Sequence, residues 1–337
     1  MNGEKPPNAK RLQNLLAVLL PLIIGGGIIC AVGIAYAERS GPLRIGVLTA
    51  SWGPTPMSVG LQDGLRELGY QEEKDYVLGV RFTRGSLSAL PNAARQLVQY
   101  GVDLIFTSEN NPALAAQQAT TEIPIVFTGV SDPVGMGLIE SFARPGGNIT
   151  GVTELYADLR PKRLAIFHEM LPELKRVLMP YNAADVIAVQ GLKVYREAAR
   201  RLGIELVESA IGSQEEAQKL LAQVDRGKVD GIISPRCCLL NIPGFILEAT
   251  AKRGLPAIFE ARFWVENGAL ASYGPDYYTS GRQAARLVDK IIKGESPAQI
   301  PVEVNPTIEF AINLKTARAL GLTIAPEVLY QADKIVR

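Results

Sequence analysis

The stretch from Val102 to Val130, VDLIFTSENNPALAAQQATTEIPIVFTGV, decides the fold. It opens with the apolar run VDLIFT, continues through an alanine-rich segment from Pro112 to Thr121, and ends in a second apolar run that starts at Ile123. Short apolar runs bounded by polar turn residues are typical of buried strands, and alanine favours the helix between them. The stretch therefore predicts a strand–helix–strand unit, in which the two strands lie parallel in one sheet.

The same alternation extends in both directions along the chain. Upstream, LRIGVLTA from Leu43 to Ala50 is typical of a buried strand, and downstream, helix and strand patterns alternate as far as Glu260. Three phrases recur in the same order roughly 130 residues later, a period far too long for a solenoid. RELGY returns as RRLGI, VDLIFTS as VDGIISP, and IPIVF as LPAIF. The recurrence predicts two α/β lobes of similar plan.

Composition narrows the class of protein. The chain has 337 residues, is 47% hydrophobic and carries a formal net charge of +1, which argues against disorder and against a nucleic-acid partner. About 300 residues remain after the N-terminal segment, which suggests two domains. The adjacent Cys237 and Cys238 do not provide a disulfide framework. They can form a vicinal disulfide or remain two buried thiols, and the sequence is compatible with both states.

The first 37 residues form a separate segment. Three basic residues precede an uncharged run that ends Ala35-Tyr36-Ala37. A basic start, an apolar middle and an A-x-A end are typical of a secretory signal, which predicts cleavage after Ala37 and a periplasmic or other extracytoplasmic location. The alternative is a membrane anchor over residues 15–34, because roughly 20 apolar residues span a bilayer.

Catalytic motifs are scarce. His168 is the single histidine of the chain, so no two-histidine metal site is expected, and no G-x-S-x-G nucleophile elbow occurs. Gly135-Met136-Gly137 lacks the third glycine of a dinucleotide loop, since Glu140 stands there. We therefore expect no enzyme activity, no cofactor and no metal.

Three long phrases carry a family resemblance. They are IPIVFTGVSDPVGMGLIESFARPGGNITGV, SYGPDYYTSGRQAARLVDKIIKGESPAQIPVE and FAINLKTARALGLTIAPEVLYQAD. In these the chain resembles ABC-transporter substrate-binding proteins of the tryptophan- and tyrosine-type branch, over nearly all of residues 43–337. The resemblance implies the type I periplasmic-binding-protein fold, with two Rossmann-like lobes joined by three crossing segments. These crossings are expected near Ile149–Thr153, Ser272–Pro275 and Val304–Ile308.

The resemblance also implies domains and partners. We expect lobe 1 to comprise residues 43–150 and 276–303, and lobe 2 to comprise residues 151–275 and 304–337. The expected partners are a small-molecule solute, plausibly an apolar or aromatic amino acid, and the permease and ATPase subunits of an ABC importer. The alternative is a membrane-anchored ligand-sensing ectodomain. Sugar-responsive repressors share this fold, but they carry a helix-turn-helix where this chain has its apolar segment.

Candidate ligand contacts follow the predicted strands, because ligands of open α/β sheets bind beyond the carboxyl ends of the strands. The candidates in lobe 1 are Ser51, Trp52, Ser108, Asn110, Asn111 and Ser131. Hydroxyls and amides there can hydrogen-bond a solute, and Trp52 offers a flat apolar face. The alternative for Trp52 is core packing, the alternative for the asparagines is capping of the next helix, and Asp132 is expected to cap a turn.

In lobe 2 the candidates are Asn182, Arg236, Tyr273 and Asp276. Asn182 corresponds to a similar asparagine in the family that the chain resembles. Arg236, like Arg262, can pair with a carboxylate through its guanidinium fork, although most arginines are simply solvated. Asp276 either holds a ligand ammonium group or caps the helix that follows it.

Overall fold

The computed structural model describes residues 41–154, 159–234 and 245–337. These residues belong to one compact unit, which is separate from the N-terminal segment. The predicted signal or anchor segment, Arg236, Cys237 and Cys238 lie outside the described residues. Within those described ranges, no helix combines the length and the apolar character that a membrane crossing requires.

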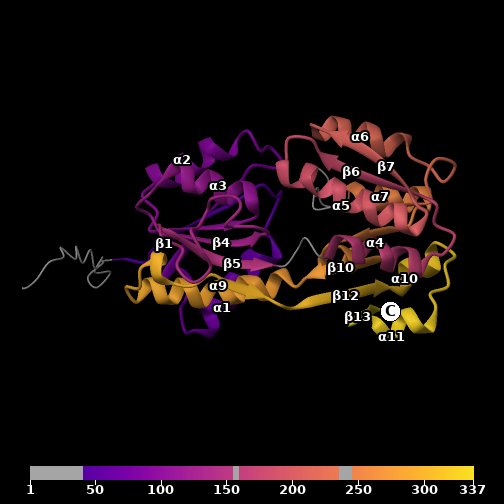
Figure 1. The fold of residues 1–337 in the computed structure, drawn as a ribbon. Coiled ribbons are helices and arrows are strands. Elements are labelled where there is room, and N and C mark those ends of the chain that lie inside the picture. The colour runs from indigo at the N-terminus through magenta and orange to yellow at the C-terminus, as the bar shows by residue number, and fades with distance from the viewer. Residues whose placement is uncertain (1–40, 155–158, 235–244) are drawn as a thin grey trace, which may run out of the picture. The chain divides into compact units, whose positions relative to one another are not determined.

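The first lobe is built on a parallel sheet whose described strands lie in the order β11-β5-β4-β3-β1-β2. Figure 1 labels β1, β4 and β5 of this sheet. They are β1 (Leu43–Thr49), β2 (Tyr76–Phe82), β3 (Leu104–Ser108), β4 (Ile125–Val130), β5 (Ile149–Glu154) and β11 (Glu303–Asn305). The predicted strand–helix–strand unit is therefore present as β3, α3 (Asn110–Ala119) and β4, with Ile105 paired to Ile125 in parallel register.

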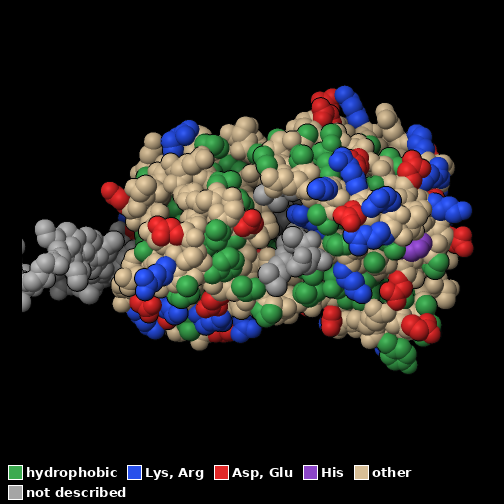
Figure 2. All heavy atoms as spheres, viewed as in Figure 1, with side chains coloured by type: hydrophobic (Ala, Val, Ile, Leu, Met, Phe, Trp, Pro, Cys, Tyr) green, Lys and Arg blue, Asp and Glu red, His purple; other side chains and the backbone are tan. Residues whose placement is uncertain are grey.

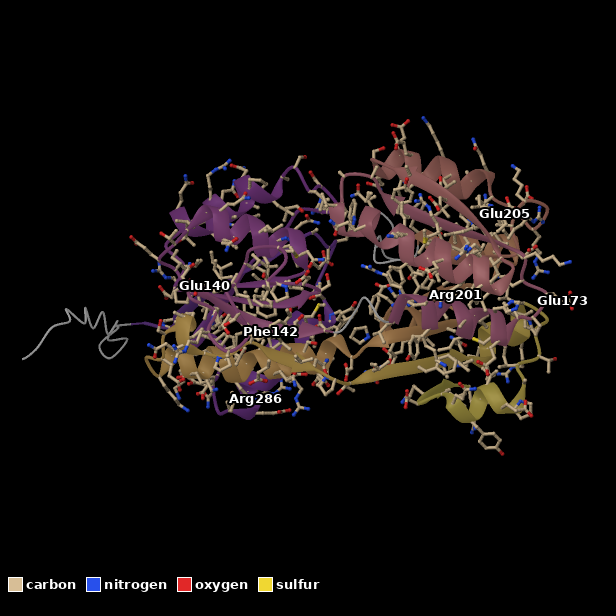
Figure 3. The ribbon with its side chains drawn as sticks, viewed as in Figure 1. Glu140, Phe142, Glu173, Arg201, Glu205 and Arg286 are labelled. Carbon is tan, nitrogen blue, oxygen red and sulfur yellow. The ribbon has the colours of Figure 1, made fainter. Side chains whose placement is uncertain are left out.

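Helices cover both faces of the first sheet because successive strand side chains point to opposite faces. Phe106 packs in the cluster that includes residues of α1 (Pro56–Glu67) and α9 (Tyr277–Ile292). Its neighbour Ile105 packs in the cluster that includes residues of α2 (Leu90–Gln99) and α3. Figure 3 shows the side chains that fill these layers.

The second lobe holds a sheet whose described strands lie in the order β13-β12-β10-β9-β8-β6-β7. They are β6 (Arg176–Asn182), β7 (Glu205–Ile211), β8 (Gly231–Ile233), β9 (Ala257–Phe259), β10 (Ala271–Pro275), β12 (Ile308–Asn313) and β13 (Lys334–Val336). The pair β10–β12 is antiparallel and the other pairs are parallel. The expectation of two Rossmann-like lobes is thereby confirmed.

The helices of the second lobe also form two layers. Helices α4 (Leu159–Met170) and α5 (Val186–Leu202) share a cluster with α10 (Leu314–Ala319) and α11 (Pro326–Gln331). Helices α6 (Gln214–Gln223), α7 (Phe245–Arg253) and α8 (Arg262–Glu266) contribute to the other cluster. A 3₁₀ turn spans Pro297–Gln299. Basic and acidic side chains both lie on the face shown in Figure 2.

The chain passes between the lobes three times. It leaves the first lobe between Glu154 and Leu159, returns after Pro275 at the end of β10, and leaves again between Asn305 and Ile308. The segment Ile149–Thr153, expected to be the first crossing, lies instead within β5, because its backbone pairs with β4 and β11. The first sheet thus extends to Glu154 and Asn305, a few residues beyond the expected lobe boundaries at 150 and 303.

A buried polar cluster joins the lobe 1 ends of these passages. Ser280 donates a hydrogen bond to the Glu154 carboxylate at 2.6 Å, and Asn305 donates to the Ser280 hydroxyl at 2.9 Å. Asn305 also donates to the backbone carbonyl of Asp276 at 2.8 Å. Glu154, Ser280 and Asn305 are each at most 3% exposed. Because unpaired buried polar groups are costly, these bonds hold the three passages in a defined arrangement.

Candidate functional site

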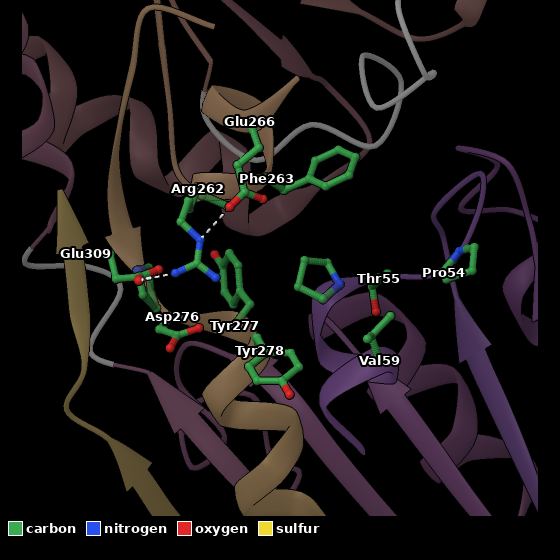
Figure 4. Close-up of a pocket in the computed structure, with 13 residues that line it drawn as sticks. Pro54, Thr55, Val59, Arg262, Phe263, Glu266, Asp276, Tyr277, Tyr278 and Glu309 are labelled. Atoms are coloured by element: carbon green, nitrogen blue, oxygen red, sulfur yellow. Dashed lines mark hydrogen bonds and ion pairs between the residues drawn. The ribbon is translucent and has the colours of Figure 1, made fainter. Parts of the chain in front are cut away.

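A pocket of about 220 Å³ lies between the two lobes, and Figure 4 shows its lining. We call it the inter-lobe pocket. Its lobe 1 wall consists of Pro54, Thr55, Pro56 and Val59, from the loop after β1 and the first turn of α1. Its remaining lining is Ala261, Arg262, Phe263, Glu266, Pro275, Asp276, Tyr277, Tyr278 and Glu309. These residues come from α8 and the residue before it, from the end of β10, from the N-cap and first turn of α9, and from the start of β12.

Local sequence places the two helix starts at this pocket. Thr55 and Ser58 form a capping box at the start of α1, where each side chain bonds the backbone N–H of the other. Asp276 caps α9, since its Oδ1 accepts from the Thr279 N–H at 3.1 Å and its Oδ2 accepts from the Thr279 hydroxyl at 2.5 Å. The two N-cap residues, Thr55 and Asp276, both line the pocket.

Glycines bring α1 and α9 into close contact along their length. A Cβ atom added at Gly281 of α9 would lie 2.0 Å from the backbone oxygen of Met57, and one added at Gly60 of α1 would lie 2.1 Å from the backbone oxygen of Tyr278. Real Cβ atoms essentially never come within 3.0 Å of such atoms. This contact therefore sets the spacing between the lobe 1 wall and the Asp276–Tyr278 segment.

Arg262 is the single basic residue of the described lining, and it is already paired. Its Nη1 contacts Glu309 Oε1 at 2.5 Å, and its Nε contacts Glu266 Oε1 at 3.1 Å. Burial raises the pKa of Glu309, the negative charge of Asp276 raises it further, and Arg262 opposes the rise. The described lining thus holds three carboxyl groups, those of Glu266, Asp276 and Glu309, beside one guanidinium group.

The rest of the pocket is apolar or aromatic. Phe263 is 46% exposed and Val59 is 39% exposed, so both present apolar surface. Tyr277 and Tyr278 follow the capping Asp276 directly. The Tyr278 hydroxyl donates to Asp63 of α1 at 2.8 Å, which fixes the orientation of its ring. Such a mixture of aromatic surface and a few polar groups is typical of small-molecule sites.

The lobe 1 candidates gather at one edge of the first sheet. Ser51 and Trp52 follow β1, Ser108 ends β3, and Ser131 follows β4; these strands are neighbours in the sheet. Asn110 Oδ1 accepts a hydrogen bond from the Ser131 N–H at 3.1 Å, which links the ends of β3 and β4. The ends of these neighbouring strands lie together, and contact between these side chains and a ligand stays a prediction.

Individual side chains at this edge differ in their partners. The Ser51 hydroxyl donates to the Gly53 carbonyl at 2.5 Å. Within the described part of the chain, the buried Ser108 hydroxyl, the Trp52 indole N–H and the Thr83 hydroxyl have no hydrogen-bond partner. Asn111 is half-buried in the first turn of α3. Sequence reasoning missed Thr83, which follows β2 directly and so shares this edge.

Glu109 adopts an unusual backbone conformation at the same edge. Its φ of 104° and ψ of 162° lie in a region that residues other than glycine rarely occupy. Its side chain makes no capping hydrogen bond at the start of α3, although Glu109 occupies the N-cap position. Strained backbone of this kind is often found at ligand sites. Nothing in the sequence signals a positive φ at a glutamate.

The lobe 2 candidates are dispersed. The buried Asn182 ends β6 and accepts from the Ala184 N–H at 2.9 Å, as a turn-forming asparagine does. The Tyr273 ring packs edge-on against Phe310 at a centroid distance of 6.3 Å, and its carbonyl accepts from Arg163 at 2.7 Å. Asp276 both caps α9 and lines the inter-lobe pocket. Of the predicted contacts that the structure describes, Asp276 is the one in this pocket.

Other expectations have clear outcomes in the described residues. Asp132 accepts from the Gly135 N–H at 2.8 Å and so caps the turn, as expected. Arg262, considered as a carboxylate partner for a ligand, is instead bound to two glutamates of the protein. Sequence reasoning missed Glu309, Tyr277 and Tyr278, although the two tyrosines adjoin Asp276. Across the described ranges, no group of three or more His, Cys, Asp or Glu side chains is arranged to hold a metal ion.

Comparison with known proteins agrees with this architecture. The model of a family described as ABC transporter substrate-binding protein matches residues 54–336. A tyrosine-binding protein of Clostridioides difficile is 28% identical over 264 residues, which cover 78% of this chain and 76% of that protein.

Solved structures are similar as well. A conserved domain protein from Vibrio cholerae is 30% identical, with a TM-score of 0.76 and coverage of 87% of this chain and 99% of that one. An ABC domain from Streptococcus pneumoniae in complex with L-Trp is 26% identical, with a TM-score of 0.76 and coverage of 88% and 100%.

Proposed function

The chain belongs to the family of ABC transporter substrate-binding proteins, and on that premise we propose that it captures a small organic solute between its lobes and delivers it to an ABC importer. Delivery to the permease and ATPase subunits of such an importer requires the lobes to lie outside the cytoplasm. The observation that carries the proposal is the inter-lobe pocket, whose lining comes from both lobes and from the passages between them. A solute there contacts both lobes at once.

The proposed mechanism is closure of the two lobes around the solute. In hinge motions of this kind, a few residues at the ends of elements change conformation while the domains stay rigid. The buried cluster of Glu154, Ser280 and Asn305 ties the three passages together at their lobe 1 ends. Bending is therefore expected on the lobe 2 side of this cluster. Solute stabilises the closed form because only that form completes both walls of the pocket.

The proposed solute is an amino acid with an aromatic side chain. Its support is the aromatic lining by Phe263, Tyr277 and Tyr278, together with the ligands of two similar proteins, tyrosine and L-Trp. His168, the single histidine, lies in α4 and is not part of the pocket lining. We propose a binding protein rather than an enzyme.

A thermal-shift screen of amino acids, amines, carboxylates and sugars tests the proposal. A solute at 100 times its dissociation constant stabilises the folded state by about 2.7 kcal/mol, and such a gain raises the melting temperature of a domain by roughly 5–10 °C. Phe263→Ala is expected to reduce the shift, because it removes exposed aromatic surface from the pocket. Tyr330→Ala is the matched control, since Tyr330 is 90% exposed in α11 and outside the pocket. A panel without any stabilising solute contradicts the proposal.

A further inference from the structure

We infer that Arg163 is a positioning residue for lobe closure: it links the start of α4 to the second passage, so that the passages enter lobe 2 on one rigid base. The inference rests on the proposed function and goes beyond it, since Arg163 is not part of the described pocket lining. The buried polar cluster described above holds the lobe 1 ends of the passages, and Arg163 holds their lobe 2 ends.

Arg163 is a fully buried arginine of α4, with 0% of its surface exposed. Its Nε donates a hydrogen bond to the Tyr273 carbonyl of β10 at 2.7 Å, and its Nη1 donates to the Tyr195 hydroxyl of α5 at 2.8 Å. Figure 1 labels α4, α5 and β10. Burying a charged group is costly unless it is hydrogen-bonded. Moving β10 away from α4 therefore takes an acceptor from a buried cationic donor, which costs more than the loss of an exposed bond.

The Tyr273 carbonyl needs a donor from outside the sheet. β10 pairs with β12 along its whole length, but with β9 only over its first two residues. Just beyond β10, the Asp276 N–H donates to the Thr307 carbonyl at 3.0 Å, and bonded and unbonded residues alternate along an antiparallel pair. Tyr273, three positions before Asp276, therefore directs its carbonyl to the side that β9 no longer covers, where Arg163 supplies the donor.

Close packing at Gly274 fixes the same end of β10. A Cβ atom added at Gly274 would lie 1.9 Å from the backbone oxygen of Glu260 and 3.3 Å from Nη2 of Arg163. Glu260 and Arg163 are themselves buried. The strand thus lies between the backbone that precedes α8 and the guanidinium group of α4, and it cannot shift toward Glu260 without a clash.

The second and third passages form one two-stranded ribbon. The pairing of β10 with β12 continues through the bond from Asp276 to Thr307, and the Asn305 side chain then donates to the Asp276 carbonyl at 2.8 Å. The buried polar cluster of lobe 1 links this ribbon to the start of the first passage. Arg163 links the ribbon to α4, where the first passage ends. Bending on closure is therefore confined to the residues between these two links.

Hydrogen exchange of the full chain without solute, read by mass spectrometry, tests the link. Arg163→Met removes the donors and keeps an unbranched side chain of similar length. A hydrogen bond to a charged group is worth roughly a factor of 10–100 in an equilibrium, so exchange in residues 273–278 and 307–310 is expected to accelerate at least about tenfold. Exchange in β6, on the far side of β9 and β8, is expected to change less than about threefold, because local openings are independent of the distant sheet.

Tyr195→Phe is the matched control. It removes the acceptor of Nη1 and leaves the bond from Nε to the Tyr273 carbonyl in place. This control is expected to lower the melting temperature, while exchange in residues 273–278 stays within about threefold of the native rate. Arg163→Lys keeps the charge and one donor, so it is expected to accelerate this exchange less than Arg163→Met does. It takes the place of Arg163→Met if that variant does not fold.

Calorimetric titration with L-tyrosine connects the link to closure. A looser base has more conformational freedom to lose when the lobes close, so Arg163→Met is expected to weaken L-tyrosine at least about threefold. Tyr195→Phe, which keeps the link to β10, is expected to leave the affinity unchanged.

The outcomes separate this inference from the proposed function. Equal acceleration in β6 and in residues 273–278 overturns the inference, because Arg163 then only stabilises lobe 2 as a whole. Unchanged exchange in residues 273–278 of Arg163→Met, or an equal acceleration in Tyr195→Phe, overturns it as well, and so does a native affinity of Arg163→Met for L-tyrosine. If the native protein binds no solute of the thermal-shift panel, the proposed function fails, and the exchange measurement still decides whether Arg163 links α4 to β10.

Discussion

Replacing Gly281 by alanine tests the contact that shapes the inter-lobe pocket. In the native packing, the new Cβ lies 2.0 Å from the Met57 oxygen and 2.9 Å from the Leu61 nitrogen, both backbone atoms of α1. Ordinary van der Waals contact begins near 3.4 Å. Backbone atoms inside a helix cannot rotate away as a side chain can, so α1 and α9 have to separate.

Two effects of opposite sign determine the size of the change. Alanine in a helix interior is more stable than glycine by roughly 1 kcal/mol. Overpacking a buried contact costs about 1–3 kcal/mol and occasionally more, and a clash with backbone places Gly281→Ala at the upper end. We therefore expect a net loss of about 2 kcal/mol in the free energy of unfolding, with weaker solute binding because Asp276–Tyr278 moves away from Val59.

Urea denaturation followed by circular dichroism measures this loss as a lower midpoint at an unchanged slope. Gly79→Ala in β2 is the matched control, since no atom lies within 4 Å of its added Cβ. We expect that control to stay within about 0.5 kcal/mol of the native protein or to gain slightly. A Gly281→Ala variant as stable as the native protein refutes the packing argument.

Three further predictions concern single polar groups. The Tyr70 hydroxyl donates to Asp289 at 2.8 Å, and burial together with this bond raises its pKa to about 12. Tyr70→Phe should lower the free energy of unfolding by about 1 kcal/mol, and the difference in urea midpoint should persist below pH 10 and shrink toward pH 12. Ser280→Ala leaves the Glu154 carboxylate and Asn305 short of one buried partner each, so a loss of about 2–3 kcal/mol is expected by the same assay. The raised pKa of Glu309 reflects burial and Asp276 first, opposition by Arg262, and a smaller contribution from Asp333. The folded state thus holds a proton that the unfolded state has released, so native stability relative to Glu309→Gln should fall as the pH rises from below 4.5 through the raised pKa. A pH-independent difference in urea midpoint contradicts this last prediction.

Local pattern was sufficient for the architecture. The stretch Val102–Val130 predicted parallel strands around a helix, and β3, α3 and β4 form that unit. Its recurrence in the second half predicted the second lobe. These inferences succeed because burial against a two-layer or three-layer core imposes periodicity on the residues themselves. Capping could also be predicted from the sequence. Asp276 and Asp132 bond backbone groups three residues away, so each partner is near in the sequence.

The residues and charges that line the pocket could not be predicted without the tertiary structure. Arg262 meets Glu309, which lies 47 positions later in the sequence, and Tyr70 meets Asp289, which lies 219 positions later. No periodicity encodes these pairs, because they arise where separate elements are brought together by packing. The sequence predicted Arg262 as a possible partner of a ligand carboxylate. In the folded protein, Arg262 instead pairs with the carboxylates of Glu266 and Glu309. The residues determined the lobes through local burial patterns, and only the tertiary structure, which brings α8, the start of α9 and β12 to one pocket, decided which charges the inter-lobe pocket presents to a solute.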